Sequence, residues 1–316
     1  MMRFRHLFLV LALCMAALPA CRPVERLVAD DASLRVVVTT TIVGDIVRRI
    51  AGEEVTVDIL VPPDADPHDY IFKPADLALA AHASVIFING AGLEGNLDRL
   101  LRGVAEPERI VDLSKNVPVR HFDGDIHHKH SAACEGLDVD PHFWTDPNLV
   151  MIWAQTIFEE LSERVPEKRD AFHLRKRALI GDLEALDHWI QEQVSAIPAS
   201  RRLLVTDHHA MGYFAARYGF EETGVVIESF DSAAQPSARA MARLVDSLRA
   251  KEIPAIFVGK SVNPQLAEQI ARDTGTAIVR LYSGALSAPE GPAPDYFTYM
   301  RYNVLQIVEA LMPREK

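Results

Sequence analysis

Three histidines stand in sequence contexts that suit metal binding. His68 lies in "DADPHDY", His142 in "DPHFWTDP" and His208 in "VTDHHAMGYF". Neutral imidazole nitrogen is a common ligand of zinc, whereas manganese and magnesium prefer carboxylate and carbonyl oxygen. Each histidine alone could equally be a solvated turn residue, because Asp-Pro pairs often begin turns. Taken together, the three histidines predict a metal site that favours zinc.

Two of these histidines follow predicted strands. His68 comes after "VTVDILVP", and His208 comes after "RRLLVTD" at the point where a helix is expected to start. In open α/β sheets, ligands bind at the carboxyl ends of strands, where loops from several strands converge. We therefore expect His68, His142 and His208 to meet in space although they are far apart in the chain.

Enzymatic interpretations of the same residues are weaker. The "DAD" at 64–66 and the "DHH" at 207–209 superficially resemble motifs of metal-dependent phosphoesterases, which need several carboxylates around two metal ions. The sequence offers few other acids beside these motifs and no phosphate-binding glycine loop. Hydrolytic zinc sites can also use three histidines, yet no "HExxH" motif and no placed glutamate base are present. An adhesin is a third class, which no residue supports. We expect a binding protein and not an enzyme.

The rest of the sequence alternates β-branched runs with helical stretches. The first half contains "LRVVVTTT", "VTVDILVP", "SVIFING" and "RIVDLS", and the second half contains "RRLLVTD", "TGVVIES", "AIFVG" and "TAIVRLY". Apolar strands separated by helices indicate a mainly parallel sheet covered on both faces. The pattern predicts an α/β fold of two lobes, at residues 34–165 and 198–316, each with a four-stranded sheet flanked by helices.

Residues 166–197 are predicted to form one helix that connects the lobes. Gly181 is the only glycine of this stretch, and apolar residues recur at helical spacing at Phe172, Leu179, Leu183, Leu186, Trp189 and Ile190. Such a helix would be about 45 Å long at 1.5 Å per residue. A rigid connection of this kind would limit hinge motion between the lobes.

A polar segment at residues 116–140 interrupts the pattern. It is longer than ordinary connections, and long loops in compact domains are usually functional or mobile. The loop could capture zinc weakly, or it could be a solvated loop that happens to contain histidines. Its histidines are His121, His127, His128 and His130.

The N-terminus has the layout of a secretory signal. Residues 1–20 contain Arg3 and Arg5, an apolar run and then small residues, and the run is too short for a membrane-spanning helix. The following "LPAC" resembles a bacterial lipoprotein signal, which implies a lipidated Cys21 and a tether over residues 21–33. The alternative is a cleaved signal with an unmodified Cys21.

Charge and cysteine content restrict the possible partners. Removing residues 1–20 takes away two arginines and no acid, so the net charge changes from −11 to −13. An acidic protein repels phosphate backbones, and we expect no nucleic-acid partner. Cys14 leaves with the signal and Cys21 is the expected anchor, so Cys134 has no obvious partner and no internal disulfide is expected.

Nearly the whole mature chain resembles the zinc and manganese solute-binding proteins of bacterial ABC transporters (cluster A-I). The resemblance is carried, in order, by "VVVTTTIVGDIVRRIAG", "VPPDADPHDYIFKPADL", "FINGAGLEGNLDRL", "DPHFWTDP", "VTDHHAMGYFAARYGF", "QPSARAMARLVDSL" and "MRYNV". It implies two α/β lobes joined by a long helix, with the metal bound in the cleft between the lobes.

The resemblance also implies the ligands. Carried over by position, they are His68, His142 and His208, while His209 falls where the family often has Asp. Gly284 in "LYSGALS" stands where many members place a fourth ligand, an aspartate. A water, Asp231 or a loop histidine could complete the coordination instead.

From these observations we expect an extracytoplasmic receptor that binds Zn²⁺ and delivers it to an ABC permease. We expect it in the periplasm or at the cell surface, as a monomer anchored through lipidated Cys21. Manganese is the alternative ion. Because imidazoles must lose their protons to bind, metal affinity should fall as the pH drops through about 6.5.

Overall fold

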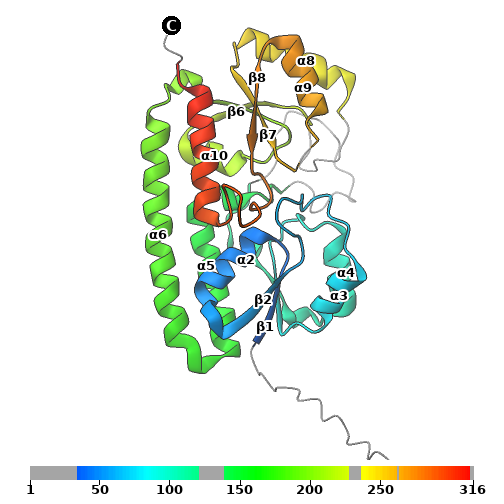
Figure 1. The fold of residues 1–316 in the computed structure, drawn as a ribbon, viewed down its shortest axis with the longest axis vertical. Helices are drawn as coiled ribbons and strands as arrows, with labels where there is room; N and C mark the ends of the chain where they lie inside the picture. The colour runs from blue at the N-terminus through cyan, green and yellow to red at the C-terminus, as the bar shows by residue number, and fades with distance from the viewer. Residues whose placement is uncertain (1–33, 121–138, 228–235, 262, 314–316) are drawn as a thin grey trace, which may run out of the picture. The chain divides into compact units, whose positions relative to one another are not determined.

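The computed structural model describes residues 34–120, 139–227, 236–261 and 263–313. Two four-stranded sheets organise this part of the chain, with strand orders β2-β1-β3-β4 and β6-β5-β7-β8. Figure 1 shows the lobe that contains β1 and β2 below the lobe that contains β6, β7 and β8. All of the strand pairs in both sheets are parallel. The predicted α/β fold with two mainly parallel four-stranded sheets is therefore confirmed.

The N-terminal lobe contains the first sheet and the helices around it. Its core strands are almost wholly apolar, because helices cover both faces of the sheet. The strands are β1 (Leu34–Val38), β2 (Val55–Ile59), β3 (Val85–Ile88) and β4 (Ile110–Asp112). The helices are α2 (Thr41–Ala51), α3 (Pro74–Ala81), α4 (Asn96–Val104) and α5 (Pro147–Arg164).

The C-terminal lobe repeats this plan. Its strands are β5 (Leu203–Thr206), β6 (Glu221–Val225), β7 (Ala255–Gly259) and β8 (Ala277–Leu281). Its helices are α7 (Gly212–Tyr218), α8 (Ala238–Ala250), α9 (Gln265–Thr274) and α10 (Tyr296–Leu311). Short 3₁₀ turns occur at Gly52–Glu54, Pro107–Arg109, Leu113–Asn116, Phe143–Thr145, Pro166–Lys168 and Ala199–Arg201.

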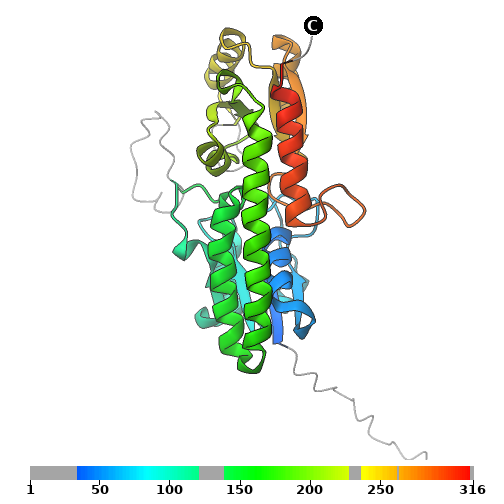
Figure 2. The same ribbon diagram turned by 90° about the vertical axis from the view of Figure 1, so that its left-hand side faces the viewer.

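One long helix, α6 (Arg169–Ser195), runs along both lobes (Figure 2). It has 27 residues, so its length is about 40 Å, and a 3₁₀ turn at Pro166–Lys168 leads into it. The predicted helix over 166–197 is confirmed with slightly narrower bounds. Its apolar side belongs to a single hydrophobic core that also contains residues of β1, α5, α7, β7 and α10. The two lobes therefore share a core along α6.

Asp187 of α6 links the helix to both lobes. Its carboxylate accepts hydrogen bonds from Asn148 of α5 at 3.1 Å, from Tyr218 of α7 at 2.9 Å and from Arg217 of α7 at 2.7 Å. Burial works against ionisation, but the hydrogen bonds from Arg217 and Tyr218 dominate and lower the pKa of Asp187. The ionised carboxylate thus holds α5, α6 and α7 together.

Several predicted features lie outside the described residues. They are the signal at 1–20, the tether at 21–33, Asp231 and the loop histidines His121, His127, His128 and His130. Within the described ranges, none of the helices is long and apolar enough to cross a membrane.

Candidate metal site

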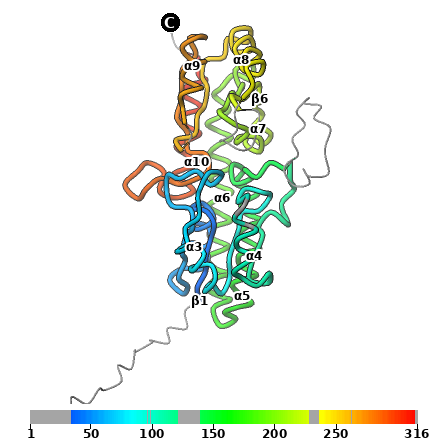
Figure 3. The backbone as a smooth tube through the Cα atoms, turned by 90° about the vertical axis from the view of Figure 1, so that its right-hand side faces the viewer, coloured from blue at the N-terminus to red at the C-terminus, as the bar shows by residue number. Residues whose placement is uncertain are grey.

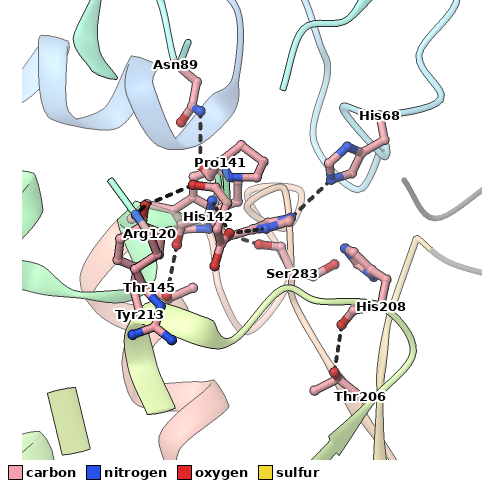
Figure 4. A network of polar contacts seen from close by, with 12 residues as sticks. His68, Asn89, Arg120, Pro141, His142, Thr145, Thr206, His208, Tyr213 and Ser283 are labelled. Carbon is pink, nitrogen blue, oxygen red and sulfur yellow. Dashed lines mark hydrogen bonds and ion pairs between the residues drawn. The ribbon is translucent and has the colours of Figure 1, made fainter. Parts of the chain in front are cut away.

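The structure brings His68, His142 and His208 together (Figure 4). One ring nitrogen of each can be chosen so that all three lie within 4.8 Å of one another. The Nε2 atoms of His68 and His142 are 3.1 Å apart, and the three ring centroids are separated by 5.2 to 5.5 Å. In a tetrahedral zinc site with Zn–N bonds of about 2.0–2.1 Å, ligand nitrogens are about 3.3 Å apart. The His68–His142 nitrogen pair is close to this separation, and the three side chains converge on one place.

The carboxylate of Asp140 orients His142 through two hydrogen bonds. Asp140 Oδ1 accepts from both the backbone N–H and the ring Nδ1 of His142, each at 2.9 Å. The Asn89 side chain donates to the carbonyl of Pro141 at 3.1 Å, which holds the intervening residue. A carboxylate can only accept hydrogen bonds, so in the metal-binding form Nδ1 carries the proton and Nε2 offers its lone pair.

The C-terminal lobe supplies His208 in a similar way. Asp207 Oδ1 accepts from the backbone N–H and from Nδ1 of His208, each at 2.9 Å, and Asp207 Oδ2 accepts from Gly259 N–H at 2.9 Å. These bonds and the one from Thr206 Oγ1 to the His208 carbonyl form a tight turn. Helix α7 consequently begins at Gly212, so the predicted helix start at His208 was wrong by several residues.

The ring of His208 has an unused nitrogen. His208 is 1% exposed, and its Nε2 is buried without a hydrogen-bond partner in the described part of the chain. A buried nitrogen lone pair without a partner is energetically costly in a protein interior. An ion held between the three rings would provide that missing partner.

The pKa values of the histidines differ. Desolvation, together with the neighbouring His142 and His208, lowers the pKa of His68 to about 3. Burial, together with His208, lowers the pKa of His142 well below its usual value. Burial also opposes protonation of His208, but the charge and hydrogen bond of Asp207 outweigh it and raise the pKa of His208. Two of the rings are therefore neutral and ready to bind a cation at neutral pH.

The supporting carboxylates were not predicted from the sequence. The aspartate of each "DPH" motif was interpreted only as a turn residue. Both aspartates do form turns in the structure: Asp66 Oδ1 accepts from His68 N–H, and Asp140 Oδ1 accepts from His142 N–H. The repeated spacing of an acid two residues before a histidine was the available signal. Burial raises the pKa of Asp140 to about 7, against the effect of its bond to His142.

The C-terminal lobe also supports Asp140. Tyr213 of α7 donates its hydroxyl hydrogen to the Asp140 carbonyl at 3.0 Å and accepts from Arg120 N–H at 2.9 Å. A Cβ atom at Gly212 would lie 2.6 Å from Asp140 Oδ2, so only glycine lets α7 approach this closely. His209, next to His208, is outside the three-histidine group.

Gly284 lies against the loop that carries His68. A Cβ atom added there would be 2.6 Å from Cδ and 2.7 Å from Cγ of Pro67, well inside ordinary contact distance. The position at which the resemblance implies a fourth ligand is therefore filled by the Pro67 ring. Among the described residues, the group that could hold a metal contains three histidines and no carboxylate.

Comparisons with known proteins identify the family of the chain. The family model described as "Zinc-uptake complex component A periplasmic" matches residues 36–310. The chain is 30% identical over 286 residues to the manganese-binding lipoprotein MntA of Halalkalibacterium halodurans, covering 89% of this chain and 90% of that protein. It is 29% identical over 271 residues to the iron-binding protein YfeA of Yersinia pestis, covering 85% and 84% of the two chains.

A solved structure gives the same result for the fold. The periplasmic zinc binding protein TroA from Treponema pallidum superposes with a TM-score of 0.80 at 27% identity, covering 89% of this chain and all of that one. The family match over residues 36–310 spans both lobes and the long helix. The chain belongs to the zinc-uptake complex component A family, the metal-binding solute-binding proteins of ABC transporters, and is not an enzyme.

Proposed function

We propose that the chain captures one Zn²⁺ with His68, His142 and His208 and delivers it for import. The observation that carries this proposal is the convergence of three imidazoles within 4.8 Å, two from the N-terminal lobe and one from the C-terminal lobe. Zinc readily accepts a four-coordinate shell rich in nitrogen, whereas manganese prefers more oxygen ligands. A site of neutral imidazoles without a described carboxylate favours zinc over manganese.

The fourth coordination position is assigned to water or a small anion. Gly284 has no side chain that could bind the ion, and the ring of Pro67 occupies the space next to it. Asp231 and the loop histidines, which were the other candidates, lie outside the described residues. The loop histidines are proposed to capture zinc weakly before it reaches the site. Deletion of residues 121–130 tests this role, and an unchanged binding stoichiometry together with an unchanged rate of zinc capture would exclude it.

Manganese is the second candidate cargo. Relatives with 30% identity are named as manganese-binding lipoproteins, from Halalkalibacterium halodurans and Bacillus subtilis. A relative's cargo does not determine this one, because a single change of ligand alters the preference between nitrogen-rich and oxygen-rich coordination. Direct competition between the two ions is therefore the decisive measurement.

The cellular setting follows from the N-terminal sequence and the family. Residues 1–20 would direct export, a lipidated Cys21 would anchor the protein, and residues 21–33 would serve as the tether. The mature protein would then be a monomer at the outer face of the membrane, with an N-terminal lobe (34–165), a connecting helix (166–197) and a C-terminal lobe (198–316). Its partner would be the cognate ABC permease.

The test is a pair of competition titrations with zinc and manganese. His68→Ala and His208→Ala should each weaken zinc binding by at least about a hundredfold, because each removes one of three ligands. His188→Ala is the matched control, since His188 is an exposed histidine on α6 whose side chain is 74% accessible. Full zinc affinity in both ligand variants would show that the ion binds elsewhere.

A further inference from the structure

The loop that carries His68 is held by the C-terminal lobe. The backbone N–H of Asp64 donates to the Leu286 carbonyl at 3.0 Å, and Asp64 Oδ2 accepts from Ala288 N–H at 3.0 Å. Leu286 N–H donates to Oγ1 of Thr41 at the start of α2, at 2.9 Å. We call residues 283–288 the docking segment; Figure 3 shows it in the orange-red stretch before α10.

Asp64 adopts a backbone conformation that needs support from its surroundings. Its φ of 60° lies in the left-handed region, which few residues other than glycine, asparagine and aspartate occupy readily. Such conformations persist where neighbouring contacts over-determine them. Within the loop, Ala65 N–H donates to the Pro62 carbonyl at 3.3 Å and closes a turn with Asp64 at its third position. The two bonds to the docking segment add to this support and fix where the turn lies.

The same loop meets the docking segment a second time at Pro67. Gly284 lies so close to the Pro67 ring that a Cβ atom would overlap Cδ and Cγ. Pro67 is buried and directly precedes His68. The four residues before His68 are thus fixed at both ends by the opposite lobe.

His68 differs in this respect from the other two histidines. The rings of His142 and His208 are each oriented by a carboxylate within the same turn, those of Asp140 and Asp207. For His68, the nearby carboxylate of Asp66 holds the backbone N–H. The position of the His68 ring therefore depends on where its whole loop lies.

We propose that Asp64 is a positioning residue for metal binding, which couples the position of His68 to the docking of residues 283–288. While the segment is docked, His68 lies 3.1 Å from His142 and the site is complete. When the segment separates from Asp64, His68 is the first ligand to lose its place, and the ion dissociates. This inference rests on the proposed function, because it assumes that the three histidines bind the cargo.

Three variants of the full mature chain test the coupling. Asp64→Gly keeps the left-handed backbone and removes the acceptor of Ala288 N–H. Asp64→Asn keeps both the backbone preference and an acceptor oxygen. Ser237→Ala is the matched control, because it removes an acceptor of a backbone N–H at the start of α8, far from the docking segment. The probe is Zn²⁺ alone, followed by competition with a chelator and by chelator-trapped dissociation.

Asp64→Gly should raise the zinc Kd about tenfold, mainly through faster dissociation, as expected for the loss of one charge-assisted hydrogen bond. Asp64→Asn should remain within about twofold of the wild type, and Ser237→Ala should not change zinc binding. Visible spectra of the Co²⁺-loaded proteins should show weakened tetrahedral bands only for Asp64→Gly. A purely structural role would lower the melting temperature of the metal-free protein and leave the cobalt spectrum unchanged.

The outcomes separate the two proposals. If the wild type binds zinc and Asp64→Gly binds it equally well, the positioning role is wrong while the proposed function stands. An Asp64→Asn protein as weak as Asp64→Gly would also overturn the positioning role, because the acceptor would then not matter. A wild type that binds neither zinc nor manganese would overturn the proposed function itself.

Discussion

Replacing Gly284 by aspartate would place a carboxylate where the family often has a ligand, but the structure predicts that this change alone weakens binding. The new Cβ atom would lie 2.6 Å from Pro67 Cδ, whereas ordinary contact begins at 3.4 Å. Overpacking of this kind typically costs about 1–3 kcal/mol. Since Pro67 precedes His68, displacing the ring moves a ligand, and Gly284→Asp should weaken both zinc and manganese binding by roughly tenfold to a hundredfold.

A second change separates crowding from coordination. Pro67→Ala removes Cγ and Cδ, and the backbone nitrogen of Pro67 is 4.0 Å from the added Cβ, so residue 284 then has room for a side chain. Combined with Pro67→Ala, Gly284→Asp should recover zinc affinity and strengthen manganese binding more than zinc binding. A carboxylate neutralises part of the metal's charge, and manganese benefits more from oxygen ligands.

The assay is a set of zinc and manganese competition titrations on the wild type, both single variants and the double variant, with melting curves of the metal-free proteins. Pro67→Ala alone is the reference for the double variant. If Gly284→Asp alone keeps wild-type zinc affinity, the contact with Pro67 does not position His68. If the double variant has the same zinc-to-manganese ratio as Pro67→Ala, the missing carboxylate does not set the preference.

Two further predictions concern protons. The pKa of His208 is raised, and the pKa of Asp140 is raised to about 7. Below pH 6 the metal-free protein should therefore hold one proton on each of these two side chains. Zinc binding must displace both protons. Calorimetry in buffers of different ionisation enthalpy should find release of roughly two protons for the wild type and one for Asp140→Asn, and release of three would contradict these pKa shifts. For Asp187 the folded pKa is lowered, so its stabilisation is present above about pH 4 and is lost as the pH falls through the folded value. Asp187→Asn should cost roughly 2 kcal/mol in denaturant unfolding at pH 7 and little at pH 2, and an equal cost at both would refute the ionic contribution.

Most of the fold could be predicted from sequence because its signals are local. Buried parallel strands appear as short apolar runs, and the spacing of Leu179, Leu183 and Leu186 marks one face of α6. Helix α5 was not predicted, although its start has a clear signature: Asp146 caps it through Asn148 N–H, and Pro147 occupies the first turn.

The candidate site could be predicted only in part. The three histidines could be predicted because their residue type and their sequence motifs both indicate metal binding. The ends of the predicted strands indicated where the histidines would meet. Contacts between lobes leave no such trace. Nothing in the sequence relates Asp64 to Ala288, or Tyr213 to Asp140, since each pair is separated by a long stretch of chain and meets only after both sheets have formed.

The shared core limits how the bound ion can be released. Residues of β1, α6, β7 and α10 belong to one continuous hydrophobic cluster, and separating the lobes widely would expose that surface at about 25 cal/mol for every Å² of apolar area. The contacts around the metal site are much weaker. Asp64 is exposed and makes two hydrogen bonds to the docking segment, so these can break without disturbing the core. Leu286 of the docking segment belongs to this core and is bonded to Thr41, so the segment itself is held in place. A partner that binds across both lobes therefore meets least resistance if it moves the His68 loop away from the docking segment while α6 stays in place.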